Sequence, residues 1–421
     1  MIKNSQKTLL IFSAIFLISS SNSVAAGYST ELYSTSGLGN SYAGSAAGSH
    51  DASDMFFNPA ILSDIKKKEL IASVNYLDLR IDPDNGSGKF LNGYQASGKE
   101  TKNAGSKSFV PAFYFATPIN NKVSFGLAIT SPFGLSTKYN KDWIGRYRAV
   151  ESSVSTVNFN PSLSYKIDEK LSFGFGFQAQ YYQATLTKSV VNSKNPYDSS
   201  YDLNGKAKGN DWGYGYNLGA TYKMNDKLKF GLGYRSKIDH KLTGTTQVPT
   251  YAYSDFDAKT TTPESLTAGI AFKLNQKVEL LYDTTWTRWS RLKSLTINAK
   301  NNALNIENTT NFNYHDSFLN SAGANFSLNE KWLVRTGLAY EKEAITNANR
   351  EPRIPSGDKI WTSIGFSYKI KNDLAFDAAY LHHFYRSARS NLTNSSDGNN
   401  SLSIKYKTKV DVLSVAIKKE F

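Results

Sequence analysis

The sequence predicts an all-β protein, a 14-stranded antiparallel transmembrane β-barrel. A secretion signal opens the chain of 421 residues, apolar and polar residues alternate over long segments, and a short polar turn recurs along the chain. Short turns on one side and longer polar loops on the other are typical of outer-membrane barrels, which have an even number of strands.

Residues 1–25 are expected to form a secretory signal peptide. Two lysines precede an apolar run at 9–18, and small residues follow the run, which is the layout of a secretory signal. Cleavage is expected after Ala25, with cleavage after Ala26 as the alternative. A membrane helix is the competing interpretation, but about ten apolar residues are too few to cross a bilayer.

The segment at 171–181 illustrates the alternation. Its odd positions hold Leu, Phe, Ala and Tyr, and its even positions hold Ser, Gly and Gln. Such strands are longer than the five or six residues usual in soluble sheets, and they suit a tilted bilayer crossing of about 9–11 residues. A large soluble sandwich is the alternative, but the glycines on the polar face disfavour a packed second layer.

The turns give the strand count. Six short polar turns are expected at 118–122, 166–170, 223–227, 273–277, 327–331 and 369–373. Seven longer polar stretches lie at about 81–106, 140–150, 190–210, 245–261, 299–311, 346–356 and 390–401. These connections join fourteen strands. Because the short turns of such barrels face the periplasm, both termini are expected there.

Residues 26–67 fit no strand and precede the barrel, which we assign to residues 68–421. The segment is rich in Gly, Ser and Ala, yet it carries more apolar residues than a free tail would. We therefore expect a hatch that plugs the lumen of a wide barrel, with a disordered secreted tail as the alternative. The hatch residues singled out are Ala26, Gly27, Tyr28, Asn58 and Pro59.

The stretch "SGLGNSYAGSAAGSHDASDMFFNPA" resembles the N-terminal hatch of the FadL family of long-chain fatty acid transporters. The stretches "VSFGLAITSPFGLSTKYN", "DWGYGYNLGATYKM", "LLYDTTWTRWSRLK" and "RIPSGDKIWTSIGFSYKI" resemble family segments in the expected order. The resemblance covers nearly the whole mature chain. It implies a hatch-plugged barrel in the Gram-negative outer membrane that takes up hydrophobic compounds, first of all long-chain fatty acids. Aromatic hydrocarbons are the nearest alternative.

The family's basic ligand positions match Lys188 and Lys293. The resemblance implies that these lysines bind the fatty acid carboxylate above an apolar pocket. Strand alternation, counted from the short turns, is expected to point both side chains inward. An ordinary lysine at the barrel rim is the alternative at each position.

Pro132, Phe133 and Gly134 match the family's kink in the third strand, which opens the wall sideways toward the membrane. A proline inside a closed sheet removes a ladder hydrogen bond or sits at a bulge. A simple bulge at the outer end of the strand is the alternative.

In the family, the ligand is first captured in an apolar surface groove between the third and fourth long loops. The fourth loop offers Tyr251, Tyr253 and Phe256 for such a groove. The third loop is polar and short for the family, so this chain departs from the family pattern there.

The chain has a formal net charge of +14 and no cysteine. The absence of cysteine excludes disulfides and thiolate zinc sites. The basic surplus fits outer-membrane lipid, lipopolysaccharide and an anionic ligand, whereas the exported location disfavours nucleic acid. We expect a monomer with no catalytic residues, metal or cofactor. An adhesin or receptor barrel is the alternative from another class, and an enzyme is third.

Overall fold

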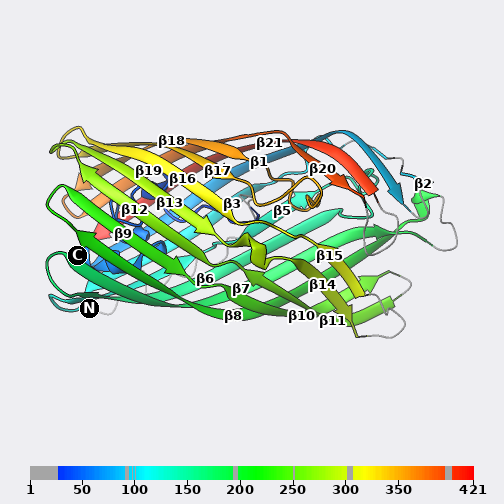
Figure 1. The fold of residues 1–421 in the computed structure, drawn as a ribbon, viewed down its shortest axis with the longest axis horizontal. Helices are drawn as coiled ribbons and strands as arrows, with labels where there is room; N and C mark the ends of the chain where they lie inside the picture. Colours follow the sequence, from blue (N-terminus) through cyan, green and yellow to red (C-terminus); the bar gives the residue numbers. More distant parts are fainter. Residues whose placement is uncertain are drawn as a thin grey trace, which may run out of the picture.

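The computed structural model describes residues 27–90, 94–96, 98–99, 101–192, 198–249, 252–300, 307–393 and 401–421. It is a closed antiparallel barrel of fourteen strands (Figure 1). The first barrel strand, β1 (Glu69–Phe90), pairs with the last, β21 (Ser401–Glu420), and this pairing closes the wall. The predicted fold class is confirmed.

Eight barrel strands are continuous: β1, β3 (Lys107–Pro118), β6 (Glu151–Lys166), β7 (Leu171–Val190), β8 (Leu203–Lys223), β17 (Trp332–Lys342), β18 (Lys359–Lys371) and β21. Six are interrupted: β4 (Val123–Thr130) with β5 (Gly134–Lys138), β9 (Leu228–Arg235) with β10 (Ile238–Val248), β11 (Ala252–Thr262) with β12 (Ser265–Lys273), β13 (Val278–Thr287) with β14 (Ser294–Ala299), β15 (Glu307–Asn311) with β16 (Ser317–Ser327), and β19 (Leu374–Tyr385) with β20 (Ala388–Leu392). The short β2 (Tyr94–Gln95) pairs with the end of β1.

The repeated turns share one hydrogen-bond pattern. In five of them the third residue is Asn or Asp, and its Oδ1 accepts from the backbone N–H groups two and three residues later at 2.7 to 3.0 Å. These residues are Asn120, Asp168, Asn225, Asn275 and Asn329. Such a side chain accepts hydrogen bonds in place of a backbone carbonyl group and so stabilises a tight turn, which explains why the motif recurs. The short turns and the C-terminus lie at the same end of the barrel (Figure 1).

Several strands extend beyond their expected ends. The stretch at 245–261 was expected to be a loop, but β10 and β11 pair from Ile238↔Thr262 to Val248↔Ala252. Likewise, β1 continues to Phe90. Strand segments that rise above the bilayer need no apolar outer face, so hydropathy does not distinguish them from loops.

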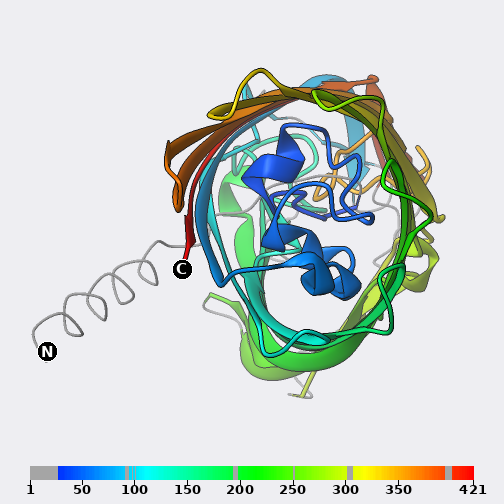
Figure 2. The same cartoon turned by 90° about the vertical axis from the view of Figure 1, so that its left-hand side faces the viewer.

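The outer wall of the barrel exposes apolar side chains at alternate strand positions. On β7, Phe173, Phe175 and Phe177 are all exposed, whereas Ser172 and Gln178, which flank this run, are buried. Figure 2 shows the described N-terminal residues inside the ring of strands. This segment contains α2 (Thr35–Leu38), η1 (Ala52–Phe56) and η2 (Pro59–Asp64).

Lumen-facing glycines let the N-terminal segment approach the wall. A Cβ atom on Gly231 would lie 1.8 Å from the Ala46 carbonyl oxygen, and one on Gly219 would lie 1.9 Å from Asn58 Oδ1. Asn58 also donates from Nδ2 to the carbonyl oxygens of Ala46 (2.7 Å) and Ala220 (2.9 Å). The glycines on the polar face thus make room for this segment.

Within the described residues, no helix is long and apolar enough to span a membrane. The expected signal peptide, its cleavage site and Ala26 lie outside the described residues.

Candidate functional site

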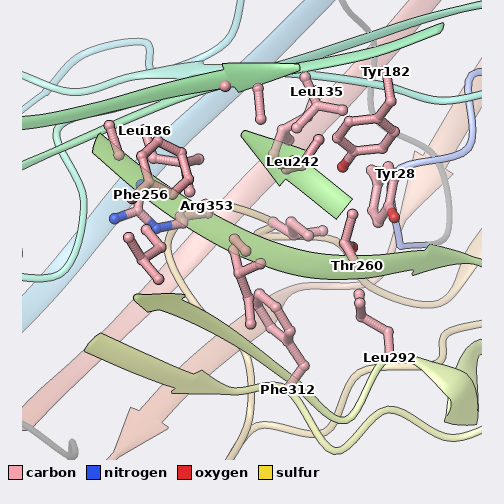
Figure 3. Close-up of a pocket in the computed structure, with 18 residues that line it drawn as sticks. Tyr28, Leu135, Tyr182, Leu186, Leu242, Phe256, Thr260, Leu292, Phe312 and Arg353 are labelled. Carbon is pink, nitrogen blue, oxygen red and sulfur yellow. The ribbon is translucent and has the colours of Figure 1, made fainter. Parts of the chain in front are cut away.

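An apolar cavity, which we call the inner cavity, lies in the lumen beyond the N-terminal segment (Figure 3). Tyr28 and Tyr182 form one end of it, and Arg353 lies at the other end (Figure 3). Its volume is about 60 Å³. It adjoins a wider cavity of about 590 Å³ nearer the long loops. The two cavities share Leu186, Ala207, Leu295, Ile297, Phe312 and Arg353 as lining residues.

Arg353 brings a cation to this apolar lining. It belongs to the segment between β17 and β18, which folds inward. Its guanidinium donates from Nη1 to Ser152 Oγ (2.8 Å) and from Nη2 to the Arg148 carbonyl oxygen (2.7 Å). Among the described residues, no carboxylate lies within ion-pair distance of it. Burial lowers the pKa of Arg353 to about 10, so the side chain is charged at neutral pH.

Three further charged groups, those of Arg148, Lys188 and Glu351, line the wider cavity together with Arg353. Arg148 Nη1 lies 2.8 Å from Glu351 Oε1, and Lys188 lines the wider cavity together with both of these residues. Burial raises the pKa of the Glu351 carboxyl, and the nearby Arg148 opposes that rise. With Arg353, the cluster holds three basic groups and one carboxylate, so its net charge is positive when all four are ionised.

Lys293 is placed differently. Its side chain is exposed, and it lines neither cavity. The strand that was expected to carry it inward ends at Thr287, and η4 (Trp289–Arg291) interrupts the wall before β14 begins. An alternation counted from the turn below does not continue through such an interruption, so the strand count does not establish the direction of Lys293, and its ligand role stays a prediction.

The third barrel strand is interrupted between Thr130 and Gly134, at the Pro132 and Phe133 positions singled out from the sequence. β4 pairs with β3 only from Phe113 onward. β5 pairs with β6, and the structure gives it no ladder to β3 in the described residues. The wall therefore has a gap between β5 and the first half of β3.

The start of the N-terminal segment fills this gap from inside. Thr30 N donates to the Pro132 carbonyl oxygen (3.0 Å), and Gly134 N donates to the Tyr28 carbonyl oxygen (2.8 Å). Ser29 and Phe133 form an antiparallel bridge between these hydrogen bonds. Residues 28–30 thus supply the backbone partners that the interrupted strand has lost.

Three aromatic rings lie between the apolar cavity and a third cavity, which is at the gap. This third cavity has a volume of about 90 Å³, and its lining includes Pro132, Phe133 and Trp289. The ring centroid of Tyr28 lies 5.6 Å from that of Phe133 and 5.3 Å from that of Trp289. Phe133 and Trp289 are 6.1 Å apart. A ligand that moves between the cavities must displace at least one of these rings.

The residues expected to form a surface groove are not together. Tyr253 is exposed, but Phe256 is 3% exposed and lines the inner cavity. β11 runs through both positions, and its alternation sends them to opposite faces. Tyr251 lies outside the described residues. Phe256 is therefore an internal residue and not part of a surface groove.

Arg353 and Trp289 were not identified from the sequence. Arg353 lies in a long connection, where no alternation indicates direction, and Trp289 lies in the turn that interrupts a strand. The one available signal was that both residues fall in segments that resemble the family, "LLYDTTWTRWSRLK" and "RIPSGDKIWTSIGFSYKI".

Comparisons with known proteins agree with this architecture. The model of a family described as outer membrane protein transport protein (OMPP1/FadL/TodX) matches residues 16–421. The long-chain fatty acid transport protein of Salmonella typhi is 28% identical over 415 residues, which cover 90% of this chain and 93% of that protein.

Solved structures show the same fold. The crystal structure of a Pseudomonas aeruginosa FadL homologue has a TM-score of 0.86 at 24% identity and covers 94% of this chain and 100% of that chain. That of the Pseudomonas putida toluene transporter TodX has a TM-score of 0.71 at 17% identity, with coverage of 94% and 100%.

The chain belongs to the OMPP1/FadL/TodX family of outer-membrane transport proteins. It is a transporter of hydrophobic compounds in the Gram-negative outer membrane and not an enzyme. The resemblance drawn from the sequence is confirmed.

Proposed function

We propose that this member of the family carries long-chain fatty acids across the outer membrane and binds their carboxylate at Arg353 and Lys188. The observation that carries the proposal is the charged Arg353 beside an apolar cavity, hydrogen-bonded to uncharged oxygens and with no carboxylate within ion-pair distance in the described part of the chain. A charge taken from water is costly unless it is paired. Glu351 offsets only one of the three basic groups in this cluster, and a fatty acid would supply both a further anion and the tail for the cavity.

The apolar lining supports binding of the tail. Each buried CH₂ group contributes about 0.8 kcal/mol, so a sixteen-carbon tail gains on the order of 10 kcal/mol when fully buried. The inner cavity, with about 60 Å³, holds only part of such a tail. The remainder would extend into the adjoining wider cavity, where Lys188 lies.

The proposed route leaves sideways through the interruption in the third strand. Residues 26–67 would act as the hatch, and their first described residues would close the gap until ligand arrives. The hydrogen bonds from Thr30 and Gly134 support this assignment because they join the hatch to the interrupted strand. The hatch need not leave the barrel for such a route, and one barrel suffices, so we propose a monomer.

An aromatic hydrocarbon is the second candidate ligand. The rings of Tyr28, Tyr182, Phe256 and Phe312 line the inner cavity, and the toluene transporter TodX has the same fold. Such a ligand would not need Arg353, which gives the two candidates different requirements.

The first prediction tests this difference. Arg353→Gln and Lys188→Gln should each weaken binding of palmitate to the purified protein by about tenfold or more, since a hydrogen bond to a charged group contributes roughly 1.5–3 kcal/mol. Binding of hexadecane, measured in the same detergent, should change little. Calorimetry or a fluorescent fatty acid displacement assay would measure both ligands.

Lys293→Gln is the matched control, because it removes the same charge from an exposed position that lines neither cavity. It should leave the affinity for palmitate unchanged. Equal losses for palmitate and hexadecane in Arg353→Gln would remove the carboxylate role, and preferential binding of toluene by the unmodified protein would favour the aromatic candidate.

A further inference from the structure

The barrel wall has a second interruption, between its eighth and ninth strands. β12 pairs with β13 up to Ser265↔Thr287, and β11 pairs with β14 only from Phe256↔Ala299 to Ala258↔Ile297. Figure 1 shows β12 and β13 nearer the short turns, and β11 and β14 nearer the long loops. Between these two ladders, residues 259–264 and 288–296 face each other without a ladder. We name this part of the wall the seam.

One charged cluster bridges the two edges of the seam at the end nearer the short turns. Arg291 donates to Glu264 from Nη2 at 2.7 Å and from Nε at 3.0 Å, and Arg288 Nη1 lies 3.2 Å from the same carboxylate. The one backbone hydrogen bond found across the described seam residues runs from Arg288 N to the Glu264 carbonyl oxygen at 3.0 Å. Both arginines are partly exposed, with side chains at 38% and 44%.

The inner cavity reaches both edges of the seam. Ala258 and Thr260 line it from one edge, and Leu292, Leu295 and Ile297 line it from the other. Thr260 and Leu292 lie near the Tyr28 end of the cavity, away from Arg353 (Figure 3). The cavity end beside the seam therefore has apolar and hydroxyl groups and no charged side chain.

The height of the seam suits exchange with the membrane. A strand rises about 3.3 Å per residue and tilts by about 40° in such barrels, so nine to ten residues above a short turn correspond to about 25 Å. Glu264 and Arg288 lie at that distance above the turn at 273–277. An apolar band about 25 Å tall ends at this level, so the seam begins at the outer boundary of the apolar band and rises from there. Its lower end is therefore within reach of compounds in the outer leaflet.

We propose that the seam is a second side portal, which exchanges uncharged hydrophobic compounds between the outer leaflet and the inner cavity, with the Glu264 and Arg291 ion pair as its latch. This goes beyond the fatty acid route, which uses Arg353 and the third strand. A compound dissolved in the leaflet reaches the cavity without passing the long loops. The uncharged cavity lining beside the seam favours a hydrocarbon over a carboxylate.

A cross-linking pair tests the portal. Continuing the register of β11 and β14 places Thr261 opposite Ser294, and neither residue lines the inner or the wider cavity. Thr261→Cys with Ser294→Cys, joined by oxidation or a short bis-maleimide, should therefore lock the seam. The matched control is Asp257→Cys with Asn298→Cys, which lies on the same face of the strands, lines neither cavity and joins residues that are already ladder partners. The chain has no other cysteine.

The expected result is a several-fold loss of uptake of labelled hexadecane by cells when the 261–294 pair is cross-linked, reversed by reductant for the disulfide. The 257–298 cross-link should leave hexadecane uptake unchanged, and neither should reduce palmitate uptake, because none of the four residues lines the cavities. Glu264→Gln, which weakens the latch, should raise hexadecane entry. Unchanged hexadecane uptake, an equal loss in the control, or a parallel loss of palmitate uptake would each overturn the portal.

Discussion

At the scale of single residues, Glu351 sets the charge of the proposed ligand site. It pairs with Arg148 and lies in the cluster with Arg353 and Lys188, so its carboxylate offsets one of the three basic groups. Burial raises its pKa above that of an exposed carboxyl. Protonation therefore begins at a higher pH than in water. As pH falls through this raised pKa, the site loses a negative charge and becomes more positive.

The second prediction follows from this gain of positive charge at the site as pH falls. An alkyl sulfonate, whose own charge does not titrate, should bind more tightly at pH 5 than at pH 7. Glu351→Gln should bind the sulfonate more tightly than the unmodified protein at pH 7 and should show a flatter pH profile. Titrations of both proteins across this range would measure the effect. A pH dependence that persists unchanged in the variant would assign the titration to another group.

At the scale of elements, the proposed route requires the contact between residues 28–30 and the third strand to break so that the gap can open. Ser29 and Phe133 are bridge partners flanked by two backbone hydrogen bonds, which is the non-hydrogen-bonded geometry with the closer side chains. Elsewhere, Thr35 Oγ1 on the hatch lies 2.6 Å from Ser414 Oγ on β21. These two pairs hold different parts of the same segment to the wall.

The third prediction compares two disulfides at these places. Ser29→Cys with Phe133→Cys should abolish palmitate uptake when oxidised and restore it on reduction, because the gap stays filled. Thr35→Cys with Ser414→Cys should leave uptake largely intact, because it pins only the body of the hatch. Uptake by cells expressing each pair, with and without reductant, would measure this. Complete loss in both oxidised pairs would mean that the whole hatch must move.

The same elements show which features the sequence could predict. Turn positions and strand faces followed from local chemistry, since the Asn or Asp in five of the turns bonds to its own neighbours and alternation needs no distant contact. The interruption at Pro132 was visible because proline lacks an N–H group. The interruption at η4 has no such residue, and for that reason the strand count could not be carried through to Lys293. Arg353 acts from a connection whose path depends on contacts with Ser152 and Arg148, far away in the sequence.

At the scale of the whole molecule, the proposed sideways path differs from a straight passage along the barrel axis, and the third strand is where the two can be told apart. Replacing Pro132-Phe133-Gly134 with Thr-Val-Thr restores a backbone donor and uses β-branched residues that favour strands. The fourth prediction is that this repaired barrel folds as well as the original or better, judged by heat-modifiable gel migration. The repaired strand should extend the ladder toward β3 and seal the gap.

Palmitate binding to the purified repaired protein should survive, because Arg353 and Lys188 are untouched and lie nearer the long loops than the repair. Uptake into cells should nevertheless fall strongly, since a bound ligand would have no exit through the wall. Binding and uptake measured on the same variant separate these two steps. Unchanged uptake after the repair, together with lost uptake after pinning Thr35 to Ser414, would instead place the passage straight through the lumen and require the hatch to be displaced.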